Sequence, residues 1–385
     1  MRCLFVHDHE FVLKESKIYS SGVLSNNVFD RYLRWCSTLK IMARCKIAEE
    51  NGGLPLDESS RVKNVSFEPL PNFWRIQTIG SAIRRIKQSV KGSDSIIVQL
   101  PSIYGIIAAH YAIKYKKPLM VEVVGDAHDA FRFHGKIGKI LAPYLSYFTR
   151  CVVKKADYVR YVTQKYLQER YPSIGKTAGY SDVNLDNMNQ SVLTNRIKKI
   201  NESNLSHLIL GTIGPIDIKY KGQHYVIKAL GQLKRQGYEF EYYLVGKGDN
   251  TYLKKIATQE GVIDKLHFLG VLNRKEIVRF LNKIDLYIQP SQTEGLPRAL
   301  IEAMNQGCPV FGSNVGGIPE LIEGENTFNV GDVNHISSIL SSLKKASLTY
   351  MASENFIHSK HFYPEILKTK DEAFFKAFFL GENYD

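Results

Sequence analysis

Two glutamates, Glu294 and Glu302, stand eight residues apart in the segment "TEGLPRALIE". Pro297 predicts a helix start, because the missing N–H of proline would have no partner in the first turn. The amides of Gly295 and Leu296 are then expected at the positive end of that helix, where anions bind. Glu302 falls on the second turn of the same helix. The order of carboxylate, anion cradle and carboxylate fits a nucleotide-sugar, which has hydroxyl groups on both sides of a diphosphate.

The spacing alone leaves a second interpretation open. A surface helix with a capped start and an incidental glutamate has the same pattern of residues. The segment does follow an apolar run, "DLYIQPS", which predicts a buried strand. The strands and helices around the two glutamates must therefore decide between a ligand site and a surface helix.

Apolar runs of strand length alternate with helical patterns along the chain, which predicts parallel sheets flanked by helices. Residues 14–46 are expected to form a loop that enters a basic amphipathic helix. The expected strands are residues 2–8, 95–100, 118–126, 157–163, 207–214, 240–245, 265–272, 285–291 and 308–314. The expected helices of the second half are residues 222–237, 274–284 and 297–307.

The length of 385 residues predicts two domains, because it exceeds what one ordinary core holds. The polar, Asn-rich segment 186–206 is the expected linker between a domain of residues 1–185 and a domain of residues 207–364. Each domain is expected to be Rossmann-like, and the two are expected to face each other across a cleft. Ligands of such sheets bind outside the carboxyl ends of the strands, where "TEGLP", "GKGD" and "GDAHD" all fall.

The net positive charge of the chain comes from its first half. The formal net charge is +13; residues 1–200 hold 31 Lys and Arg against 17 Asp and Glu, and residues 201–385 hold 20 against 21. This segregation indicates an anionic partner for the first domain: acidic lipid headgroups, a phosphate-bearing acceptor or nucleic acid. A solubilising surface is the simpler alternative. The absence of an RNA-binding signature or recognition-helix motif disfavours nucleic acid.

The sequence predicts neither a membrane span nor a secretory signal. Its most apolar stretch, residues 95–113, is interrupted by Gln99, Pro101 and His110, so it is expected to form a strand, a loop and a buried helix. Met1 leads directly into an apolar strand instead of a signal peptide. Five cysteines without ligand spacing are typical of reduced thiols in a cytosolic protein. We therefore expect a cytoplasmic protein.

The two glutamates belong to a longer pattern. E-G-L-P-x-x-x-x-E followed by "GCPVFGSNVGGIPELI" resembles the EX7E region of the retaining glycosyltransferases of family 4, the glycosyl transferases group 1. The similarity extends upstream through "KYKGQHYVIKAL", "VGKGD" and "HFLGVL", so it covers the C-terminal half well and the N-terminal half loosely. The resemblance implies the α/β GT-B fold, with a C-terminal helix, residues 365–385, that rejoins the first domain.

The resemblance also implies a role for each matched position. Glu302 is expected to bind the ribose hydroxyls, Glu294 the donor sugar near its anomeric carbon, and Lys221 the diphosphate. Val271 and Leu272 are expected to contact the base through their backbone.

Two glycines complete the expected donor site. Gly22, in a Ser-Gly loop of the first domain, is expected to approach the diphosphate, and Gly246 follows a predicted strand of the second domain. The family usually works without a bound metal, and the sequence contains no Asp-x-Asp pair. We therefore expect no metal and no cofactor apart from the donor substrate.

The sequence departs from the family pattern at two places. Many members carry an arginine directly after the glycine that ends the first strand of the second domain, and here that position is assigned to Thr212. Either Lys219 replaces the missing charge or Lys221 acts alone. The histidine that often follows a strand of the first domain is also absent from its place, and Asp126 and His128 are the candidates to contact the donor sugar there.

The expected function is transfer of a sugar, with retention of configuration, from a UDP- or GDP-sugar to a saccharide acceptor. The acceptor is expected to be linked to a polyprenyl diphosphate, as in the synthesis of bacterial surface polysaccharides. Two alternatives share the fold: a soluble enzyme that acts on a small molecule, and a nucleotide-sugar epimerase. A nucleic-acid-binding protein is the alternative outside the enzymes.

A basic and aromatic segment of the first domain, residues 134–156, suits contact with a membrane surface. A helix packed on the sheet with a solvated basic edge is the alternative. If the segment binds lipid, we expect a peripheral protein on the inner face of the cytoplasmic membrane. The residues that support this expectation are Lys136, Lys139, Tyr144, Tyr147, Phe148, Arg150, Lys154 and Lys155.

Overall fold

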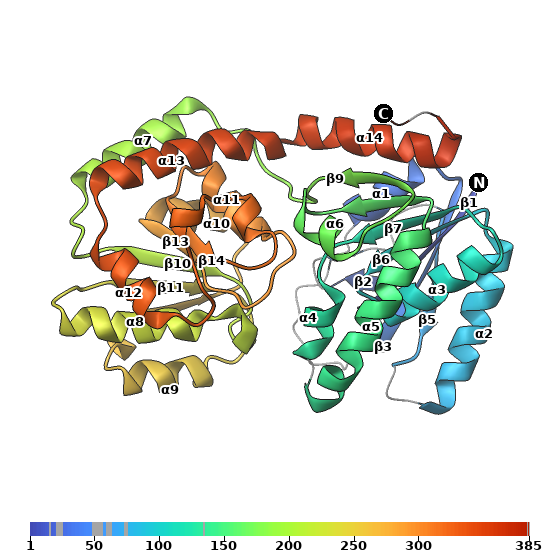
Figure 1. The fold of residues 1–385 in the computed structure, drawn as a ribbon, viewed down its shortest axis with the longest axis horizontal. Helices are drawn as coiled ribbons and strands as arrows, with labels where there is room; N and C mark the ends of the chain where they lie inside the picture. Colours follow the sequence, from blue (N-terminus) through green and yellow to red (C-terminus); the bar gives the residue numbers. More distant parts are fainter. Residues whose placement is uncertain are drawn as a thin grey trace. The chain divides into compact units, whose positions relative to one another are not determined.

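The computed structural model describes residues 1–14, 17–20, 26–47, 57–58, 64–72, 76–133, 135–382 and 384. The chain divides into two compact units, Met1–Tyr180 with Thr369–Asp385, and Ser181–Lys368 (Figure 1). The first unit keeps the excess of positive charge, with 30 Lys and Arg against 19 Asp and Glu.

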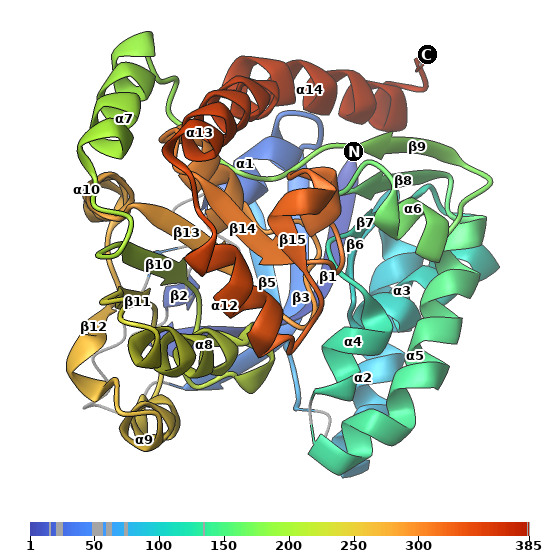
Figure 2. The same cartoon turned by 60° about the vertical axis from the view of Figure 1, so that its left-hand side comes forward.

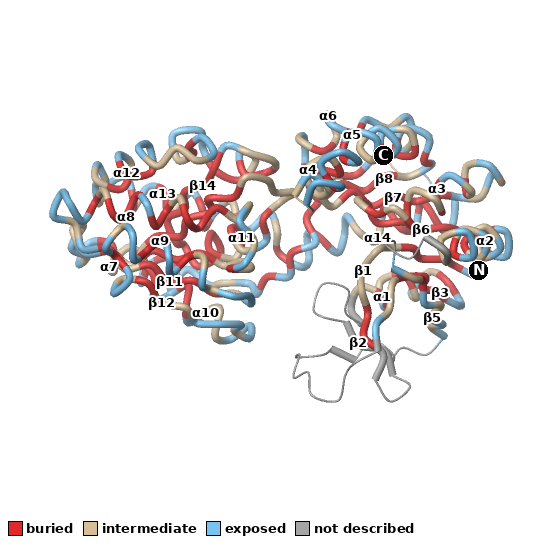
Figure 3. Tube along the Cα trace, turned by 90° about the horizontal axis from the view of Figure 1, so that it is seen from below, coloured by how far each residue is buried: buried red, intermediate tan, exposed pale blue. Residues whose placement is uncertain are grey.

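In the described part of the first unit, the sheet has seven parallel strands in the order β5-β3-β1-β6-β7-β8-β9. Strand β2 pairs with β1, and β4 pairs with β2, each in the antiparallel direction. Its central strands β6 and β7 are buried along their whole length, as apolar strands of parallel sheets are (Figure 3). The bounds are β1 Arg2–Lys14, β2 Lys17–Ser20, β3 Thr38–Ile47, β4 Asp57–Glu58, β5 Val65–Leu70, β6 Ser95–Leu100, β7 Leu119–Val123, β8 Tyr158–Tyr161 and β9 Lys176–Gly179.

Helices cover both faces of this sheet. Helices α2, α3 and α5 pack together on one face, and α1 and α14 lie on the other (Figure 1). Phe375 of α14 packs against Tyr32 of α1, and Phe374 packs against Tyr158 of β8. The bounds are α1 Asn26–Leu33, α2 Ile76–Gly92, α3 Ile103–Lys114, α4 Ala127–Arg132, α5 Gly135–Lys155, α6 Tyr166–Arg170 and α14 Pro364–Leu380.

The second unit contains six parallel strands in the order β12-β11-β10-β13-β14-β15. Helices α8 and α9 cover one face, and α7 and α13 the other (Figure 2), where α11 packs on α13. The strands are β10 Ile209–Ile213, β11 Glu241–Val245, β12 Leu266–Gly270, β13 Leu286–Gln289, β14 Val310–Ser313 and β15 Thr327–Phe328. The helices are α7 Gln190–Glu202, α8 Gln223–Arg235, α9 Thr251–Gln259, α10 Arg274–Lys283, α11 Arg298–Asn305, α12 Val333–Ser341 and α13 Lys345–Ser359, with five 3₁₀ turns, η1 to η5.

These two sheets confirm the predicted α/β class and its parallel strands. Two segments differ from the expectations. Residues 14–46 contain the short helix α1 and most of strand β3, which pairs with β1 and β5, instead of a long basic helix. The expected linker 186–206 contains α7, which buries Leu193 and Ile200 and packs on α13 within the second unit. No helix in the described part of the chain is long and apolar enough to span a bilayer.

Candidate active site

Lys221 and Glu294 form the centre of the candidate site. Lys221 lies on the 3₁₀ turn η1 (Lys219–Lys221) after β10, and Glu294 lies in the loop after β13, so both follow carboxyl ends of parallel strands. The Nζ of Lys221 is 2.7 Å from Oε1 of Glu294. Burial acts to lower the pKa of Lys221, but the adjacent Glu294 carboxylate outweighs burial and raises this pKa. Lys221 is therefore a fixed positive charge at the edge of the sheet.

One oxygen of Glu294 takes all of its hydrogen bonds. Besides Lys221, Ser291 Oγ donates to Oε1 at 2.7 Å and Gln289 Nε2 donates to it at 3.0 Å. Oε2 has no hydrogen bond to any residue that the structure describes. The carboxylate is thus held in one orientation, and one oxygen stays available for a ligand hydroxyl.

Two glycines allow the loops of this site to touch. Gly222 has a φ of 75°, and a Cβ there would lie 1.8 Å from the carbonyl oxygen of Pro290. Gly316 has a φ of 57°, and a Cβ there would lie 2.1 Å from the carbonyl oxygen of Glu294. Only glycine fits both the left-handed backbone and the close approach. The loop that carries Lys221 and the loop that carries Glu294 are therefore locked against neighbouring backbone.

Helix α11 begins beside Glu294, as its sequence predicts. Pro297 precedes the first helical residue, Arg298, with a φ of −73°, one position away from the expected start and within the usual uncertainty of helix ends. Within the described residues, no acceptor is found for the backbone N–H groups of Gly295, Leu296, Arg298 and Ala299. Unpaired N–H groups at a helix start favour an anion.

Glu302 lies on the second turn of α11, in the wall of a separate pocket of about 270 Å³ that Arg274 and Asp186 also line. Burial raises the pKa of Glu302, although the positive charges of Arg298 and Arg274 oppose the shift. Arg274 is held in place by Asp186, with Nη2 2.7 Å from Oδ1. Glu302 and Glu294 share no hydrogen-bond partner among the described residues.

Gly246, Val271 and Leu272 follow the carboxyl ends of β11 and β12. The N–H of Gly246 donates to the carbonyl of Gly270 at 2.8 Å, which joins the two loops. Val271 is 63% exposed and Leu272 is half-buried. Val271 is therefore exposed at the edge where parallel sheets bind ligands.

Thr212 does not join this group. Thr212 was expected directly after the glycine that ends the first strand of the second domain. Strand β10 instead continues past Gly211 and ends at Ile213, so the glycine that follows the strand is Gly214 and the assignment of Thr212 was wrong. The Thr212 hydroxyl is buried, at 2.6 Å from both Tyr242 Oη and the carbonyl oxygen of Ile288. These bonds direct it into the sheet interior.

Lys219 also lies apart from Glu294. It is exposed, and its Nζ lies 4.5 Å from the centre of the Tyr252 ring. Of the two candidate lysines, Lys221 is thus the one that contacts the carboxylate.

In the first unit, hydrogen-bond donors from neighbouring residues surround the carboxylate of Asp126. Its buried carboxylate caps α4 through the N–H of His128 at 2.7 Å, and it accepts from Tyr171 Oη and Arg170 Nε at 2.8 Å and from Tyr166 Oη at 3.1 Å. These contacts account for Asp126 as a structural residue.

His128 is more accessible than Asp126. Its side chain is 31% exposed, and Nδ1 lies 3.3 Å from Oδ1 of the adjacent Asp129. It lies near the carboxyl end of β7, so its side chain can meet a ligand. The Gly22 prediction falls outside the described residues.

The sequence analysis missed two residues that hold Glu294. Gln289 is the last residue of β13 and Ser291 follows it two positions later, and both bond to Glu294. Two polar residues at alternate positions, directly after an apolar run and before a candidate carboxylate, were the available signal.

In the described ranges, no three His, Cys, Asp or Glu side chains are grouped so that they could hold a metal ion.

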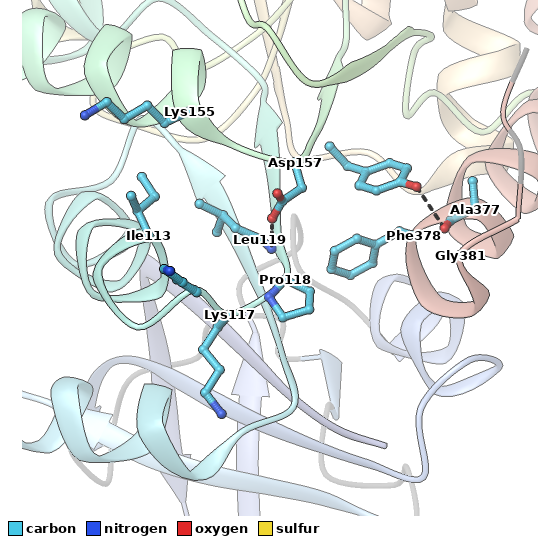
Figure 4. A pocket seen from close by; sticks show the side chains of 11 residues that line it. Ile113, Lys117, Pro118, Leu119, Lys155, Asp157, Ala377, Phe378 and Gly381 are labelled. Atoms are coloured by element: carbon cyan, nitrogen blue, oxygen red, sulfur yellow. Dashed lines mark hydrogen bonds between the residues drawn. The ribbon is translucent and has the colours of Figure 1, made fainter.

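A pocket of about 500 Å³ in the first unit lies at the amino ends of its parallel strands. Its wall includes Leu119 and Tyr158, the first residues of β7 and β8, with Lys116, Lys117 and Phe378 (Figure 4). Tyr158 Oη donates to the carbonyl of Ala377 at 2.9 Å, so α14 closes one side. Ligands of parallel sheets bind at the carboxyl ends of the strands, so this pocket is not part of the candidate site.

Comparison with known proteins agrees with the geometry. Residues 194–358 match the family described as Glycosyl transferases group 1. Protein CapJ of Staphylococcus aureus is 33% identical over 350 residues, which cover 89% of this chain and 86% of CapJ. The amylovoran biosynthesis glycosyltransferase AmsK of Erwinia amylovora is 42% identical over 110 residues, 27% of each chain. HepE of Anabaena, solved with UDP and glucose, matches over the whole of both chains with a TM-score of 0.65 and 17% identity.

The two parallel-sheet units and the similarity to these solved structures define the GT-B fold. The chain belongs to the glycosyl transferases group 1 family and is a glycosyltransferase.

Proposed function

We propose that this enzyme transfers a sugar, with retention of configuration, from a nucleotide-sugar to a saccharide acceptor carried on a lipid. The product belongs to a surface polysaccharide. The observation that carries the proposal is the half-buried Lys221–Glu294 pair, 2.7 Å apart, beside the unpaired N–H groups at the start of α11.

The positive groups suit a departing diphosphate. An ammonium has three donors, and Glu294 takes one of those of Lys221, so the others stay free for phosphate oxygens. The N–H groups of Leu296, Arg298 and Ala299 add a second set of donors. Both sets are fixed before the reaction, so they stabilise the negative charge that grows on the leaving group without reorganisation. We therefore expect transfer to continue in the presence of EDTA.

The carboxylates suit the two ends of the donor. Oε2 of Glu294 can accept a hydrogen bond from the transferred sugar, while Glu302 can accept from the ribose. HepE was solved with UDP and glucose, and this supports a UDP-sugar as the first donor to test. The backbone of the exposed Val271 and of its neighbour Leu272 is the proposed contact of the base.

The names of two relatives support the acceptor class. AmsK is a glycosyltransferase of amylovoran biosynthesis, and WcaL of Escherichia coli is described as a putative glycosyltransferase of colanic acid biosynthesis. We therefore propose that the acceptor is a growing saccharide of a surface polymer.

Donor binding and transfer can be tested separately. A thermal-shift screen with UDP-, GDP- and ADP-sugars identifies the donor, because a ligand of the folded state raises Tm. The donor found is then incubated with saccharide-diphosphate lipids, and the anomeric configuration of the product is read by NMR. Inverted product contradicts retention, and conversion of the donor alone into an isomer indicates an epimerase instead.

A further inference from the structure

Helix α5 exposes six large apolar side chains along one side. They are between 41% and 67% exposed and recur at steps of three and four residues, which places them on one helix face. The opposite face is buried and includes Ala142, Thr149 and Val153. The exposed residues are Ile137, Ile140, Leu141, Tyr144, Tyr147 and Phe148.

This face is unlike the rest of the surface. Sixteen large apolar side chains are exposed among the described residues, and six of them fall within twelve positions of α5. Elsewhere they are scattered, as Ile174 is, and single exposed apolar residues need no explanation. A contiguous exposed apolar face marks a site of contact with another protein or with a membrane.

The charges of α5 point to the nature of that body. The helix contains five Lys and Arg and no Asp or Glu. The guanidinium of Arg150 donates to the carbonyl of Arg170, so it belongs to the fold. The four lysines are exposed and form no ion pair with another described residue; Lys136 and Lys139 lie in the first turn and a half of the helix, on either side of Ile137, and Lys154 and Lys155 follow the last apolar residue.

We infer that this face of α5 lies in the surface of an anionic lipid bilayer. Its apolar side chains insert among the upper acyl chains, its lysines contact the lipid phosphates, and the phenol groups of Tyr144 and Tyr147 lie at the headgroups, where amphipathic rings are favoured. A second copy of the chain fits less well, because a symmetric contact through this face would oppose two sets of lysines. The inference rests on α5 alone and is independent of the donor chemistry.

Sedimentation with lipid vesicles tests the inference in the full chain. The wild type is expected to bind vesicles of phosphatidylcholine with phosphatidylglycerol, and to bind phosphatidylcholine alone far less. The combined variant Ile140→Gln, Tyr144→Gln and Phe148→Gln should reduce binding by at least about tenfold. Replacing Lys136 and Lys139 by Gln should reduce it about fivefold for each charge.

The matched control carries Tyr350→Gln and Ile357→Gln, two residues of α13 that are 54% and 52% exposed. It should bind vesicles as the wild type does, and circular dichroism should show native melting for every variant. An equal loss of binding in the control, or a wild type that does not bind anionic vesicles, overturns the inference.

Tyr144→Trp separates insertion from electrostatic attraction. Its emission is expected to shift to the blue with anionic vesicles. Binding without this shift means that α5 does not insert, and the inference is then wrong. Sedimentation velocity adds a last outcome: a wild-type dimer that the apolar variant dissociates, with no vesicle binding, would assign the face to a second copy.

Discussion

Lys221 and Glu294 are 73 residues apart in sequence, yet Nζ of the lysine lies 2.7 Å from Oε1 of the glutamate. Their side chains are 18% and 12% exposed, so little water screens the pair. The loops after β10 and β13 meet because these strands are neighbours in the sheet. The pair gives the site a cation next to the start of α11, and this arrangement makes the following predictions testable.

Lys221→Ala should slow sugar transfer far more than it weakens binding of the nucleoside. The charge of Lys221 is expected to act on the diphosphate, where negative charge grows in the transition state. Removal of one preorganised donor typically lowers kcat by about 10²–10³. Steady-state kinetics with the identified donor, together with calorimetry of the free nucleoside, measures both effects.

Lys219→Ala is the matched control, because Lys219 lies two residues before Lys221 on the same turn, places its ammonium over the Tyr252 ring and contacts no described carboxylate of the site. It should retain nearly full activity. Normal transfer by Lys221→Ala and loss in Lys219→Ala would show that the other lysine meets the diphosphate.

Glu302→Ala should weaken donor binding by about 1.5–3 kcal/mol, the usual contribution of a hydrogen bond to a charged group. Isothermal calorimetry with the donor measures this loss. Glu323→Ala, an exposed glutamate after the Gly-Gly-Ile-Pro-Glu segment, should bind as the wild type does. Unchanged affinity in Glu302→Ala, with the fold intact, would exclude a contact between this residue and the donor.

Glu302 should also make donor binding depend on pH. Its pKa is raised by burial, so protonation begins at a higher pH than for an exposed glutamate. A protonated carboxyl accepts hydrogen bonds less well, and donor affinity is therefore expected to fall as the pH drops through this raised pKa. Glu302→Gln should flatten the profile between neutral and mildly acidic pH. A profile that stays the same in the variant would assign the dependence to another group.

The same shift has an opposite consequence for stability. A raised carboxyl pKa means that the ionised form is less favourable in the folded state than in the unfolded state. Any stabilisation from the protonated form is therefore present at low pH and lost as the pH rises through the folded pKa. At neutral pH, Glu302→Gln should raise the Tm of the donor-free enzyme while it weakens donor binding, a trade-off common at functional sites. A lower Tm in this variant would contradict the prediction.

Gly222→Ala should disorder the Lys221 loop and abolish donor binding. Its added Cβ would meet the carbonyl oxygen of Pro290 at 1.8 Å in addition to the left-handed backbone. Gly261 separates these causes, because its φ of 70° is similar but nothing lies within 4 Å of a Cβ there. Gly261→Ala should cost about 1–2 kcal/mol from backbone strain and leave donor binding intact. If Gly222→Ala and Gly261→Ala were equally destabilised in denaturant melts, the close approach of Gly222 to Pro290 would contribute nothing to the cost of the substitution.

Much of this site follows from short-range sequence signals. Pro297 and the preceding Gly-Leu pair predicted the start of α11 to within one residue, because proline fixes φ locally. The buried strands β6 and β7 were predicted from short apolar runs rich in Val and Ile, which are typical of strands in a sheet covered on both faces.

The remaining features depend on contacts between distant segments. Strand β3 was expected to be part of a helix, since "TLKIMARCKI" mixes basic and apolar residues and only its pairing with β1 and β5 decides the conformation. Asp126 was a candidate for the donor sugar, and its partners Tyr166, Arg170 and Tyr171 come from a segment about forty residues later. No local pattern announces such contacts.

A buried ionic group in the first unit allows a last test. Glu122 of β7 is fully buried, with Oε1 2.9 Å from Arg31 Nη2 and Oε2 3.2 Å from Arg160 Nη2. Arg31 also reaches Asp371 of α14 at 3.4 Å. Burial acts to raise the pKa of Glu122, but Arg160 and Arg31 outweigh it and lower this pKa. The stabilisation from Glu122 is therefore present above its unfolded pKa and is lost as the pH falls through the depressed value.

Arg31→Leu should destabilise the fold by about 3–5 kcal/mol, because it leaves Arg160 as the one described cation beside the buried Glu122 and removes the charge that faces Asp371. Arg34→Leu is the matched control: Arg34 also lies next to α1 and pairs with α14, through Glu372 at 3.3 Å, but both side chains are about half exposed. Its loss should cost less than about 1 kcal/mol, as for other surface pairs. Urea unfolding at neutral pH compares the two, and the gap between wild type and Arg31→Leu should narrow on acidification as Glu122 becomes protonated. Equal effects of the two substitutions would mean that burial of the Arg31 contacts does not determine how firmly α1 and α14 are held.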